Sequence, residues 1–316
     1  MSTTSSFPRR LPSPISARDL CALVGESPID VIGDADVIIE SVTALDDGVQ
    51  GALVFCSSKS TFRAPQLIAA SRASVLVVAI DVAAEPGRCF IKVMDPVRWF
   101  VVALQKLFAP DLRENQTHPT AIVGRNVRLG RNVGLAPYSV VGDRVSIGDD
   151  SIVGTGCFIG PDTEIGSRCV IGANTSIGAS GHGMWRDGRA APVHFTHLGR
   201  VIIGNEVEVG AQCVIVRGIL KDTIIEDWSK IGNLVNVGHN CHLASNSWVA
   251  ARAVLCGSVR LEPNAMIGAG ASINNHTVIG ADASVGLGSV VTRDVAPGTR
   301  VFGIPARPLR TMRPVV

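Results

Sequence analysis

A six-residue repeat is the feature of this sequence that most restricts its fold. From Ala121 onward, ten hexads follow one another in one register. Each has a branched aliphatic residue at its third position and Gly at its fourth, with Ala136 as the exception. A period of six matches neither the roughly 3.6 residues per turn of an α-helix nor the roughly two of a strand. It is typical of repeat architectures, whose stacked units bury one continuous core.

The repeats are interrupted twice. They stop at Ser180 for about twenty residues and return with Ile203. Their register then shifts once by four residues, around residues 218–221, and resumes at Ile225. Three hexads make one triangular coil of about eighteen residues, and about eight coils would stack about 4.8 Å apart. The glycine after each aliphatic residue suits a tight corner, because Gly accepts a positive φ.

The part of the chain before the repeats predicts a small α/β domain. Ser16 is a preferred N-cap for a helix over residues 17–24, and Pro96 is well placed to begin an amphipathic helix. Strand-like runs occur at 37–39, 53–55, 75–80 and 90–93, with a helical segment at 65–72. The expected domain order is a loose N-terminus at 1–15, the α/β domain at 16–112, a β-helix at 113–310 with a loop at 179–200, and a tail at 311–316.

Composition argues against several function classes. The net charge is +2 with Lys and Arg scattered, which does not favour a nucleic-acid partner. No apolar run approaches the roughly 20 residues of a membrane span, and the N-terminus lacks the apolar region of a signal peptide, so we expect a cytoplasmic protein. The eight cysteines are dispersed without a CxxC pair. Four of them, Cys157, Cys169, Cys213 and Cys241, sit two residues before the aliphatic position of their hexads, and we expect these to pack as small apolar residues.

The coil period places three candidate residues on one strip of surface. Gly257 follows His239 by eighteen residues and should stack directly over it, while His276 lies two coils and one residue beyond His239. An imidazole can take the proton of an attacking amine, and a backbone N–H can stabilise a tetrahedral oxyanion. Together these groups predict acyl transfer from a thioester to an amine. The alternative for each histidine is a hydrogen-bonded surface role.

The other histidines do not favour a metal site. His242 follows His239 by three residues and falls on the next strand. His194 and His197 are three residues apart in a non-helical segment, which is weak support for metal ligands. We therefore expect no metal and no permanently bound cofactor.

Several runs of the sequence resemble one known family. They are IGNLVNVGHNCHLASNSWVAARAVLCGSV, GASINNHTVIG, RVIIGNEVEVGAQCVIVRGILKDTII and FGIPARP within the repeats, and LVFCSSKSTFR and VMDPVRWFVVALQKLF before them. Over about residues 16–310 the chain is similar to the UDP-3-O-(3-hydroxyacyl)glucosamine N-acyltransferases of lipid A biosynthesis, which are hexapeptide-repeat acyltransferases.

This resemblance implies a fold, a reaction and a set of site residues. The fold is a left-handed parallel β-helix preceded by a uridine-binding α/β domain. The family forms homotrimers with each site in the groove between neighbouring β-helices. By resemblance, His239 is the general base and Gly257 the oxyanion donor. The acyl donor is the phosphopantetheine thioester of acyl carrier protein, and the acceptor is a nucleotide-linked amino sugar. The substrate-binding residues are then His276, Asn233, Asn240, Phe55 and Phe62.

Some positions depart from the family pattern and leave alternatives open. Gly232 stands where the family usually has Asp, Thr61 stands where it has a uracil-stacking Tyr, and the chain ends at Val316 without the C-terminal helices of many relatives. One alternative is an N-acetyltransferase for surface polysaccharide that uses acetyl-CoA or another short acyl-CoA. Another is a non-catalytic β-helical scaffold that binds a nucleotide sugar. The sequence leaves open the acyl length, the sugar and the group that orients His239.

Overall fold

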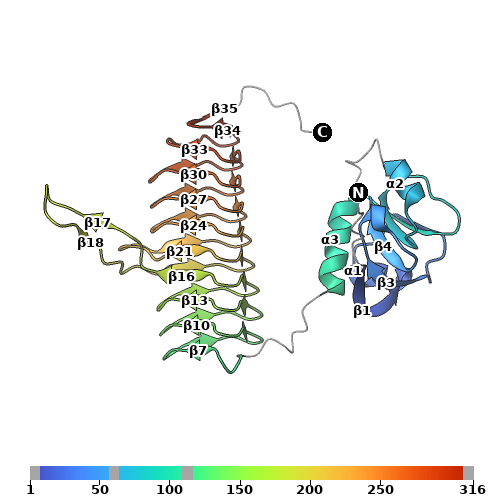
Figure 1. The fold of residues 1–316 in the computed structure, drawn as a ribbon, viewed down its shortest axis with the longest axis horizontal. Coiled ribbons are helices and arrows are strands. Elements are labelled where there is room, and N and C mark those ends of the chain that lie inside the picture. Colours follow the sequence, from blue (N-terminus) through green and yellow to red (C-terminus); the bar gives the residue numbers. More distant parts are fainter. Residues whose placement is uncertain (1–7, 57–63, 109–116, 309–316) are drawn as a thin grey trace, which may run out of the picture. The chain divides into compact units, whose positions relative to one another are not determined.

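The computed structural model describes residues 8–56, 64–108 and 117–308, and the chain divides into two compact units (Figure 1). The division falls between Pro110 and Asp111, close to the boundary expected at residue 112.

The first unit is a six-stranded sheet with helices on both faces. In the sheet order β1-β3-β4-β5-β6-β2, the strands from β3 to β6 pair in parallel, and β1 and β2 are antiparallel edge strands. Helices α1 and α3 share one core, which contains Leu20 and Trp99, while α2 contributes Ile68 to the other. The elements are β1 (Arg9–Ser16), α1 (Ala17–Val24), β2 (Asp30–Ile32), β3 (Ile38–Val42), the 3-10 turn η1 (Leu45–Asp47), β4 (Ala52–Phe55), α2 (Ala64–Ala70), β5 (Val75–Ala79), β6 (Cys89–Val93) and α3 (Pro96–Leu107).

Two local helix signals in this unit are confirmed. The Ser16 hydroxyl accepts a hydrogen bond from the Asp19 N–H at 3.0 Å, which caps α1. Helix α3 begins at Pro96, where the missing N–H costs nothing. The preceding Asp95 carboxylate accepts from the Arg98 N–H at 3.0 Å.

Two edge strands were not predicted. The expectation of a loose N-terminus at residues 1–15 is wrong from Arg9 onward, because β1 pairs with β3. Pro12 and Pro14 conceal this strand from a propensity reading, and they are tolerated because β1 lies at the edge of the sheet. Strand β2 has only three residues and pairs with β6. The local sequence pattern is weak for both strands, so their strand conformation depends on pairing with β3 and β6.

The second unit is a parallel β-solenoid, as the hexads predict. Its short strands stack into three long sheets (Figure 1), each named here after its first strand. The β7 sheet contains β7 (Ile122–Val123), β10 (Val140–Val141), β13 (Phe158–Ile159), β16 (Ser176–Ala179), β21 (Val214–Val216), β24 (Asn236–Val237), β27 (Val254–Leu255), β30 (Ser272–Ile273) and β33 (Val290–Val291).

The two remaining sheets complete each triangular coil. The β8 sheet contains β8 (Arg128–Leu129), β11 (Ser146–Ile147), β14 (Glu164–Ile165), β19 (Val201–Ile203), β22 (Thr223–Ile225), β25 (His242–Leu243), β28 (Arg260–Leu261) and β31 (Val278–Ile279). The β9 sheet contains β9 (Gly134–Leu135), β12 (Ile152–Val153), β15 (Val170–Ile171), β20 (Glu208–Val209), β23 (Lys230–Ile231), β26 (Trp248–Val249), β29 (Met266–Ile267), β32 (Ser284–Val285), β34 (Arg300–Gly303) and β35 (Ala306–Pro308).

Strand pairing gives the coil length directly. Val141 pairs with Val123, so successive coils are 18 residues apart. The offset grows to 38 between Ile165 and Ile203, where the twenty-residue excursion leaves the coil. It is 22 between Ile203 and Ile225, where four residues are inserted. Both interruptions therefore fall where the sequence indicated them.

The interior of the solenoid is closely packed aliphatic side chains. Third-position residues such as Leu135, Ile159 and Ile215 are 0 % exposed. Cys157, Cys169, Cys213 and Cys241 are buried with them and form no disulfide, which fits their expected role as small fillers. Their thiols reach backbone carbonyls of neighbouring residues, as Cys213 does with Gly232 at 3.0 Å.

The glycine after each aliphatic residue has a different purpose from the one expected. Gly124 does not adopt a positive φ; instead, a Cβ there would lie 2.7 Å from the backbone nitrogen of Asp143 in the next coil. Positive φ occurs two residues later, at non-glycine residues such as Asn126. Asn and Asp tolerate this region best among residues with a Cβ. Close stacking of coils, rather than corner conformation, therefore selects the glycine.

The twenty-residue excursion is more ordered than the expected loop. It contains an antiparallel hairpin, β17 (Met184–Trp185) and β18 (Val193–His194), which projects from the side of the solenoid (Figure 1). The coil resumes at β19. Within residues 8–56, 64–108 and 117–308, none of the helices is long and apolar enough to cross a bilayer.

Candidate active site

The candidate site lies at the corner between β24 and β25, where His239 follows the β7 sheet. Its imidazole rests against Gly257 in the next coil. A Cβ on Gly257 would come within 2.5 Å of both Cε1 and Nε2 of the ring. Only glycine fits at this position, and the stacking predicted from the eighteen-residue spacing is confirmed.

One ring nitrogen of His239 has a hydrogen-bond partner. Nδ1 lies 3.0 Å from Oδ1 of Asn240. An amide oxygen can only accept, so Nδ1 carries the proton of the neutral ring. Nε2, the nitrogen beside Gly257, then holds the free lone pair and is the basic atom.

The projecting excursion brings a second histidine, His197, to His239. The two ring centroids are 5.7 Å apart with the planes at 70°. His197 is 5 % exposed, and its Nδ1 donates to the Phe195 carbonyl at 2.9 Å. Its Nε2 is buried with no partner among the described residues. Burial lowers the pKa of His197, against the opposing effect of the Phe195 carbonyl, so the ring is neutral near pH 7.

Sequence reasoning considered His197 only as a weak metal ligand. A better signal was the pair of glycines in the same excursion, because Gly181 and Gly183 leave the space that this ring fills. A Cβ at Gly181 would lie 2.8 Å from Nε2 of His197. In the described chain, no group of three or more His, Cys, Asp or Glu side chains is arranged to hold a metal ion.

The backbone N–H of Gly257 is available to a ligand. At equivalent corners an Asp or Asn of the next coil accepts from this amide, as Asp149 does from the Arg131 N–H at 2.8 Å. One coil beyond Gly257 stands Asn275, whose side chain makes no such hydrogen bond within residues 117–308. An amide free of an internal acceptor can donate to a substrate oxygen.

A pocket of about 450 Å³ opens beside this corner. Its lining consists of the inserted residues Ile219, Leu220 and Lys221 and the corner residues Asn240, Ser258 and His276. The three corner residues are eighteen apart and all have positive φ. His276 is therefore stacked in the column of Asn240, beside the column of His239 and Gly257, as its one-residue offset predicts.

Two other polar residues are not brought to the site. Asn233 lies one corner earlier, between β23 and β24, where its Oδ1 accepts from the Ala211 N–H at 2.8 Å. It holds two coils together. His242, on β25, has its Nε2 2.7 Å from Oε1 of Glu226. That contact directs His242 to Glu226 rather than to a metal shared with His239.

In the first unit, Phe55 lines an apolar pocket of about 530 Å³. Its ring stacks on Phe100 with centroids 4.5 Å apart. Thr43 lines the same pocket, and its hydroxyl is buried without a partner among the described residues. A flat ring with a hydrogen-bonding edge suits such a lining. Phe62 lies outside the described residues.

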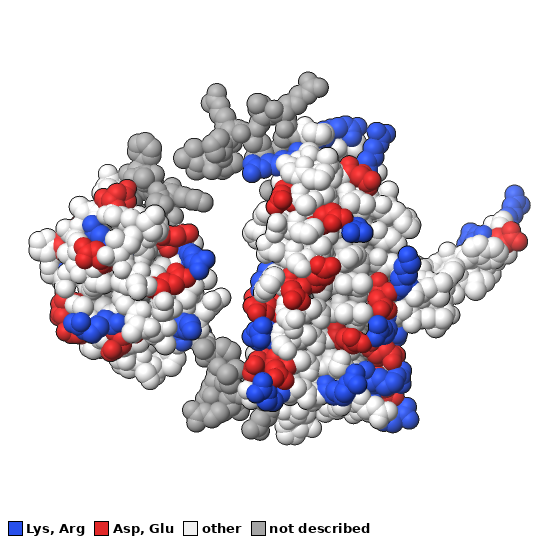
Figure 2. All heavy atoms as spheres, turned by 180° about the vertical axis from the view of Figure 1, so that it is seen from behind, with Lys and Arg blue, Asp and Glu red and all other residues white. Residues whose placement is uncertain are grey.

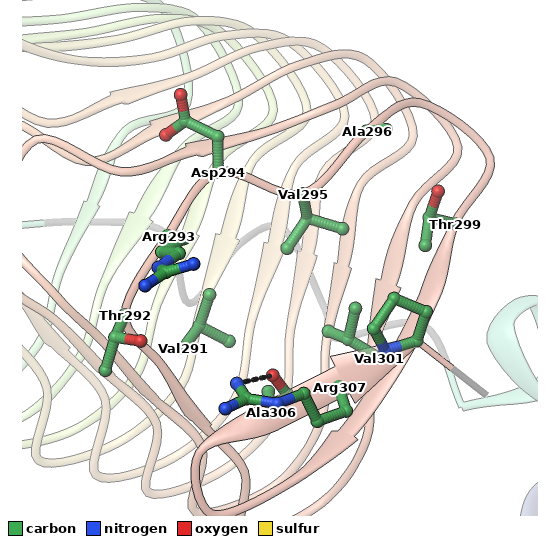
Figure 3. Close-up of a pocket in the computed structure, with 11 residues that line it drawn as sticks. Val291, Thr292, Arg293, Asp294, Val295, Ala296, Thr299, Val301, Ala306 and Arg307 are labelled. Atoms are coloured by element: carbon green, nitrogen blue, oxygen red, sulfur yellow. Dashed lines mark hydrogen bonds between the residues drawn. The ribbon is translucent and has the colours of Figure 1, made fainter.

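A further hollow, of about 470 Å³, lies at the C-terminal end of the solenoid (Figure 3). Its apolar floor includes Val291, Val295 and Val301, which are themselves buried at the end of the core. Strand β33 is three strands beyond β24 in the β7 sheet, about 14 Å along the axis. This hollow therefore marks the end of the repeat and is separate from His239.

Charged side chains of both signs are intermixed on the face shown in Figure 2. Several pair between neighbouring coils, including Arg131 with Asp149 and Arg144 with Asp162, each at 2.7 Å.

Known families match the second unit. The model described as "Bacterial transferase hexapeptide (six repeats)" matches residues 144–179, and "Hexapeptide repeat of succinyl-transferase" matches residues 120–161 and 258–293. With the parallel β-solenoid and the His239–Gly257 corner, these matches define a hexapeptide-repeat acyltransferase.

Relatives of known name narrow this class. The chain is 38% identical over 262 residues to the UDP-3-O-acylglucosamine N-acyltransferase of Delftia acidovorans, across 81% of this chain and 76% of that protein. Proteins of the same name from Albidiferax ferrireducens and Chlorobium luteolum are 38% and 33% identical. Those matches span 78% and 72% of this chain and 75% and 70% of theirs. The chain belongs to the UDP-3-O-acylglucosamine N-acyltransferase family.

Solved structures share the fold. UDP-N-acetylglucosamine acyltransferases from Campylobacter jejuni and Bacteroides fragilis match with TM-scores of 0.55 and 0.56 at 23% and 20% identity. Each match covers 61% of this chain and 74% of the other. At this identity the likeness supports the β-helix alone.

Proposed function

We propose that this protein transfers an acyl group from a thioester to the amine of UDP-3-O-acylglucosamine, a step of lipid A synthesis, with His239 as the general base. The observation that carries the proposal is the His239–Gly257 corner. The His239 ring, whose Nδ1 contacts Asn240, rests directly against a glycine whose N–H has no acceptor among the described residues. Acyl transfer requires this pairing of a base with an oxyanion donor.

The reaction follows from these two groups. Nε2 of His239 takes a proton from the sugar ammonium, and the freed lone pair of the amine forms a bond to the thioester carbonyl carbon. The Gly257 N–H donates to the oxygen, which becomes negatively charged. Protonated His239 then gives its proton to the sulfur as the oxyanion collapses and the C–S bond breaks, so the leaving group departs as a thiol. The neutral imidazole takes the remaining proton from the attacking nitrogen and releases it to solvent, which regenerates the base and gives a net release of one proton.

Other residues define the two substrates in this proposal. His276 and Ser258 line the pocket beside the base, where the acyl donor arm would lie. Phe55, stacked on Phe100, would hold the uracil ring. The donor is the phosphopantetheine thioester of acyl carrier protein, as membership of the family suggests, and an acyl-CoA is the competing donor.

We also propose that the active form is a homotrimer. Many outward side chains along the β7 sheet are apolar, and several are exposed, including Ile122 at 63%, Phe158 at 38% and Val254 at 37%; the polar residues Ser176, Asn236 and Ser272 lie between them. A heterologous contact repeated around a three-fold axis would cover such a stripe and close the ring. It would also place a neighbouring chain against the His239 edge of the β7 sheet.

The proposal places the enzyme in the cytoplasm. The four cysteines inside the solenoid, Cys157, Cys169, Cys213 and Cys241, form no disulfide among the described residues, as is usual for proteins in a reducing compartment. Carrier-protein and CoA thioesters are formed in the same compartment.

Product masses test the proposed reaction. The purified protein would be incubated with a UDP-linked 3-O-acylglucosamine and either 3-hydroxyacyl carrier protein or acetyl-CoA. We expect an N-acylated product from the carrier-protein thioester. His239→Ala should lower turnover by about 10² or more, the contribution of a general base, with the oligomer intact. His242→Ala is the matched control. Near-normal turnover by His239→Ala would exclude His239 as the base.

A further inference from the structure

The group that orients His239 can be identified from the contacts of Asn240. Its Oδ1 accepts from Nδ1 of His239 at 3.0 Å and from the Ile219 N–H at 3.3 Å. Its Nδ2 donates to the Lys221 carbonyl at 3.0 Å. Its backbone N–H donates to the Thr223 hydroxyl at 2.9 Å. Both ends of the amide are therefore engaged by protein groups.

Two of these partners allow only one orientation of the amide. The Ile219 N–H can only donate and the Lys221 carbonyl can only accept. Reversing the amide of Asn240 would bring NH₂ against an N–H and oxygen against a carbonyl. Oδ1 must therefore face Ile219 and His239, and Nδ1 of His239 must carry the proton. The free lone pair is thereby assigned to Nε2.

Both backbone groups come from the four-residue insertion between β21 and β22. Without it, the pairing offset would be 18 rather than 22, and an ordinary corner would take the place of Ile219 and Lys221 beside Asn240. Two glycines leave the space that the Lys221 carbonyl occupies, because a Cβ at either Gly199 or Gly218 would collide with its oxygen. The four-residue insertion thus supplies the Ile219 N–H as a donor and the Lys221 carbonyl as an acceptor to the Asn240 amide.

We propose that this insertion is a tautomer clamp: Ile219 and Lys221 fix the Asn240 amide, and Asn240 is a positioning residue that keeps Nε2 of His239 unprotonated. The proposal rests on the proposed function, in which Nε2 is the base. It gives Asn240 a role different from the substrate binding that family resemblance implies. Leu220, 75% exposed between the two clamp residues, remains free to line the pocket beside them.

Asn240→Leu is the principal test, and Asn246→Leu is its matched control. Asn246 is also a corner residue with positive φ, and its amide donates to Asn264 at 2.7 Å, away from His239. Leucine is accommodated at such a corner, since Leu234 has φ of 62°. We expect Asn240→Leu to lower kcat by about 10- to 100-fold, part of what a general base contributes, with KM for the nucleotide sugar within about twofold. The control should keep both values.

Asn240→Asp provides the conservative rescue. A carboxylate can still accept from Nδ1 of His239, but its second oxygen faces the Lys221 carbonyl in place of the donating NH₂, so part rather than all of kcat should return. Its negative charge also favours the imidazolium form, which should move the acid limb of the kcat/KM profile to higher pH. His197 is the other titratable ring in contact with His239. The same shift should therefore persist when His197→Gln is combined with Asn240→Asp.

Nitrogen-15 spectra of histidine-labelled protein read the tautomer without turnover. The chain has seven histidines, and the His239 signals are identified by their loss in His239→Ala. We expect a protonated Nδ1 and an unprotonated Nε2 in the wild type, and protonation at Nε2 in Asn240→Leu. An unprotonated Nδ1 in the wild type, an unchanged tautomer in Asn240→Leu, or a raised KM with unchanged kcat would each overturn the clamp. If no acceptor is acylated, the proposed function is wrong. The nitrogen-15 spectra still test the clamp in that case, because they do not depend on turnover.

Discussion

His197 forms part of the wall of the site, and its burial makes the stability of the folded protein depend on pH. The unfolded chain exposes this imidazole, whose ordinary pKa is about 6.5, whereas burial lowers the pKa in the folded state. Between the two values the unfolded chain binds more protons than the folded one. Stability therefore falls as pH drops through about 6.5, and the loss levels off once folded His197 is itself protonated.

His197→Gln should reduce this acid sensitivity. Glutamine keeps a polar side chain of similar length but does not titrate, so the variant should lose less stability on acidification than the wild type. Unfolding temperatures between about pH 8 and about pH 5 measure the difference. His118→Gln, at an exposed histidine near the start of the second unit, controls for the loss of one histidine. Parallel curves for His197→Gln and the wild type would show that burial of this ring does not set the acid response.

Among the secondary-structure elements, the sequence predicts best the strands of the solenoid, because the same packing requirement recurs in successive hexads. The third position of every hexad points inward, so Ile171 and its equivalents could be assigned to the core without a structure. Strand β1 has no such signal, because its two prolines are acceptable only at a sheet edge. The hairpin β17–β18 likewise follows from pairing between two short segments rather than from a repeating pattern.

In the candidate site, the sequence likewise predicts the positions of residues that belong to the repeat and not those of residues outside it. Eighteen-residue arithmetic placed Gly257 over His239, because both belong to the repeat. It could not place His197 or the Lys221 carbonyl, since these groups come from the two interruptions and reach the corner through tertiary contacts. The family resemblance put Asn233 among the substrate-binding residues, and in the folded chain its side chain accepts a hydrogen bond from the Ala211 amide.

Strand β15 offers a direct test of the inward position. Ile171 is 1% exposed and its neighbour Val170 is 44% exposed. Ile171→Ala should cost about 2 to 5 kcal/mol, because the solenoid cannot collapse onto the cavity, while Val170→Ala should change stability by less than about 0.5 kcal/mol. Chemical unfolding followed by circular dichroism compares the two. Equal losses would mean that the hexad period does not separate core from surface here.

At the scale of the molecule, the sheets of the solenoid differ in their outer surfaces. The β7 sheet carries an apolar column of Ile122, Phe158 and Val254. The outward positions of the β8 sheet include Arg128 and Glu164 instead. An exposed apolar column of this length is typical of an interface, whereas a charged one is typical of a surface that stays in water. The β9 sheet also exposes Val170, Trp248 and Met266, so the β7 sheet is proposed as the contact because His239 lies at its edge.

Val254→Asp should therefore dissociate the proposed trimer. The new carboxylate would be buried against a neighbour without a partner, which costs several kcal/mol at each contact. Light scattering on the eluting protein should give three times the chain mass of 33.1 kDa for the wild type and a single chain for the variant. Ser146→Asp, on the β8 sheet, should remain trimeric. Turnover should fall with the mass of Val254→Asp, because the neighbouring chain completes the groove beside His239. A trimeric Val254→Asp, or a monomeric and fully active wild type, would remove the β7 sheet from the assembly.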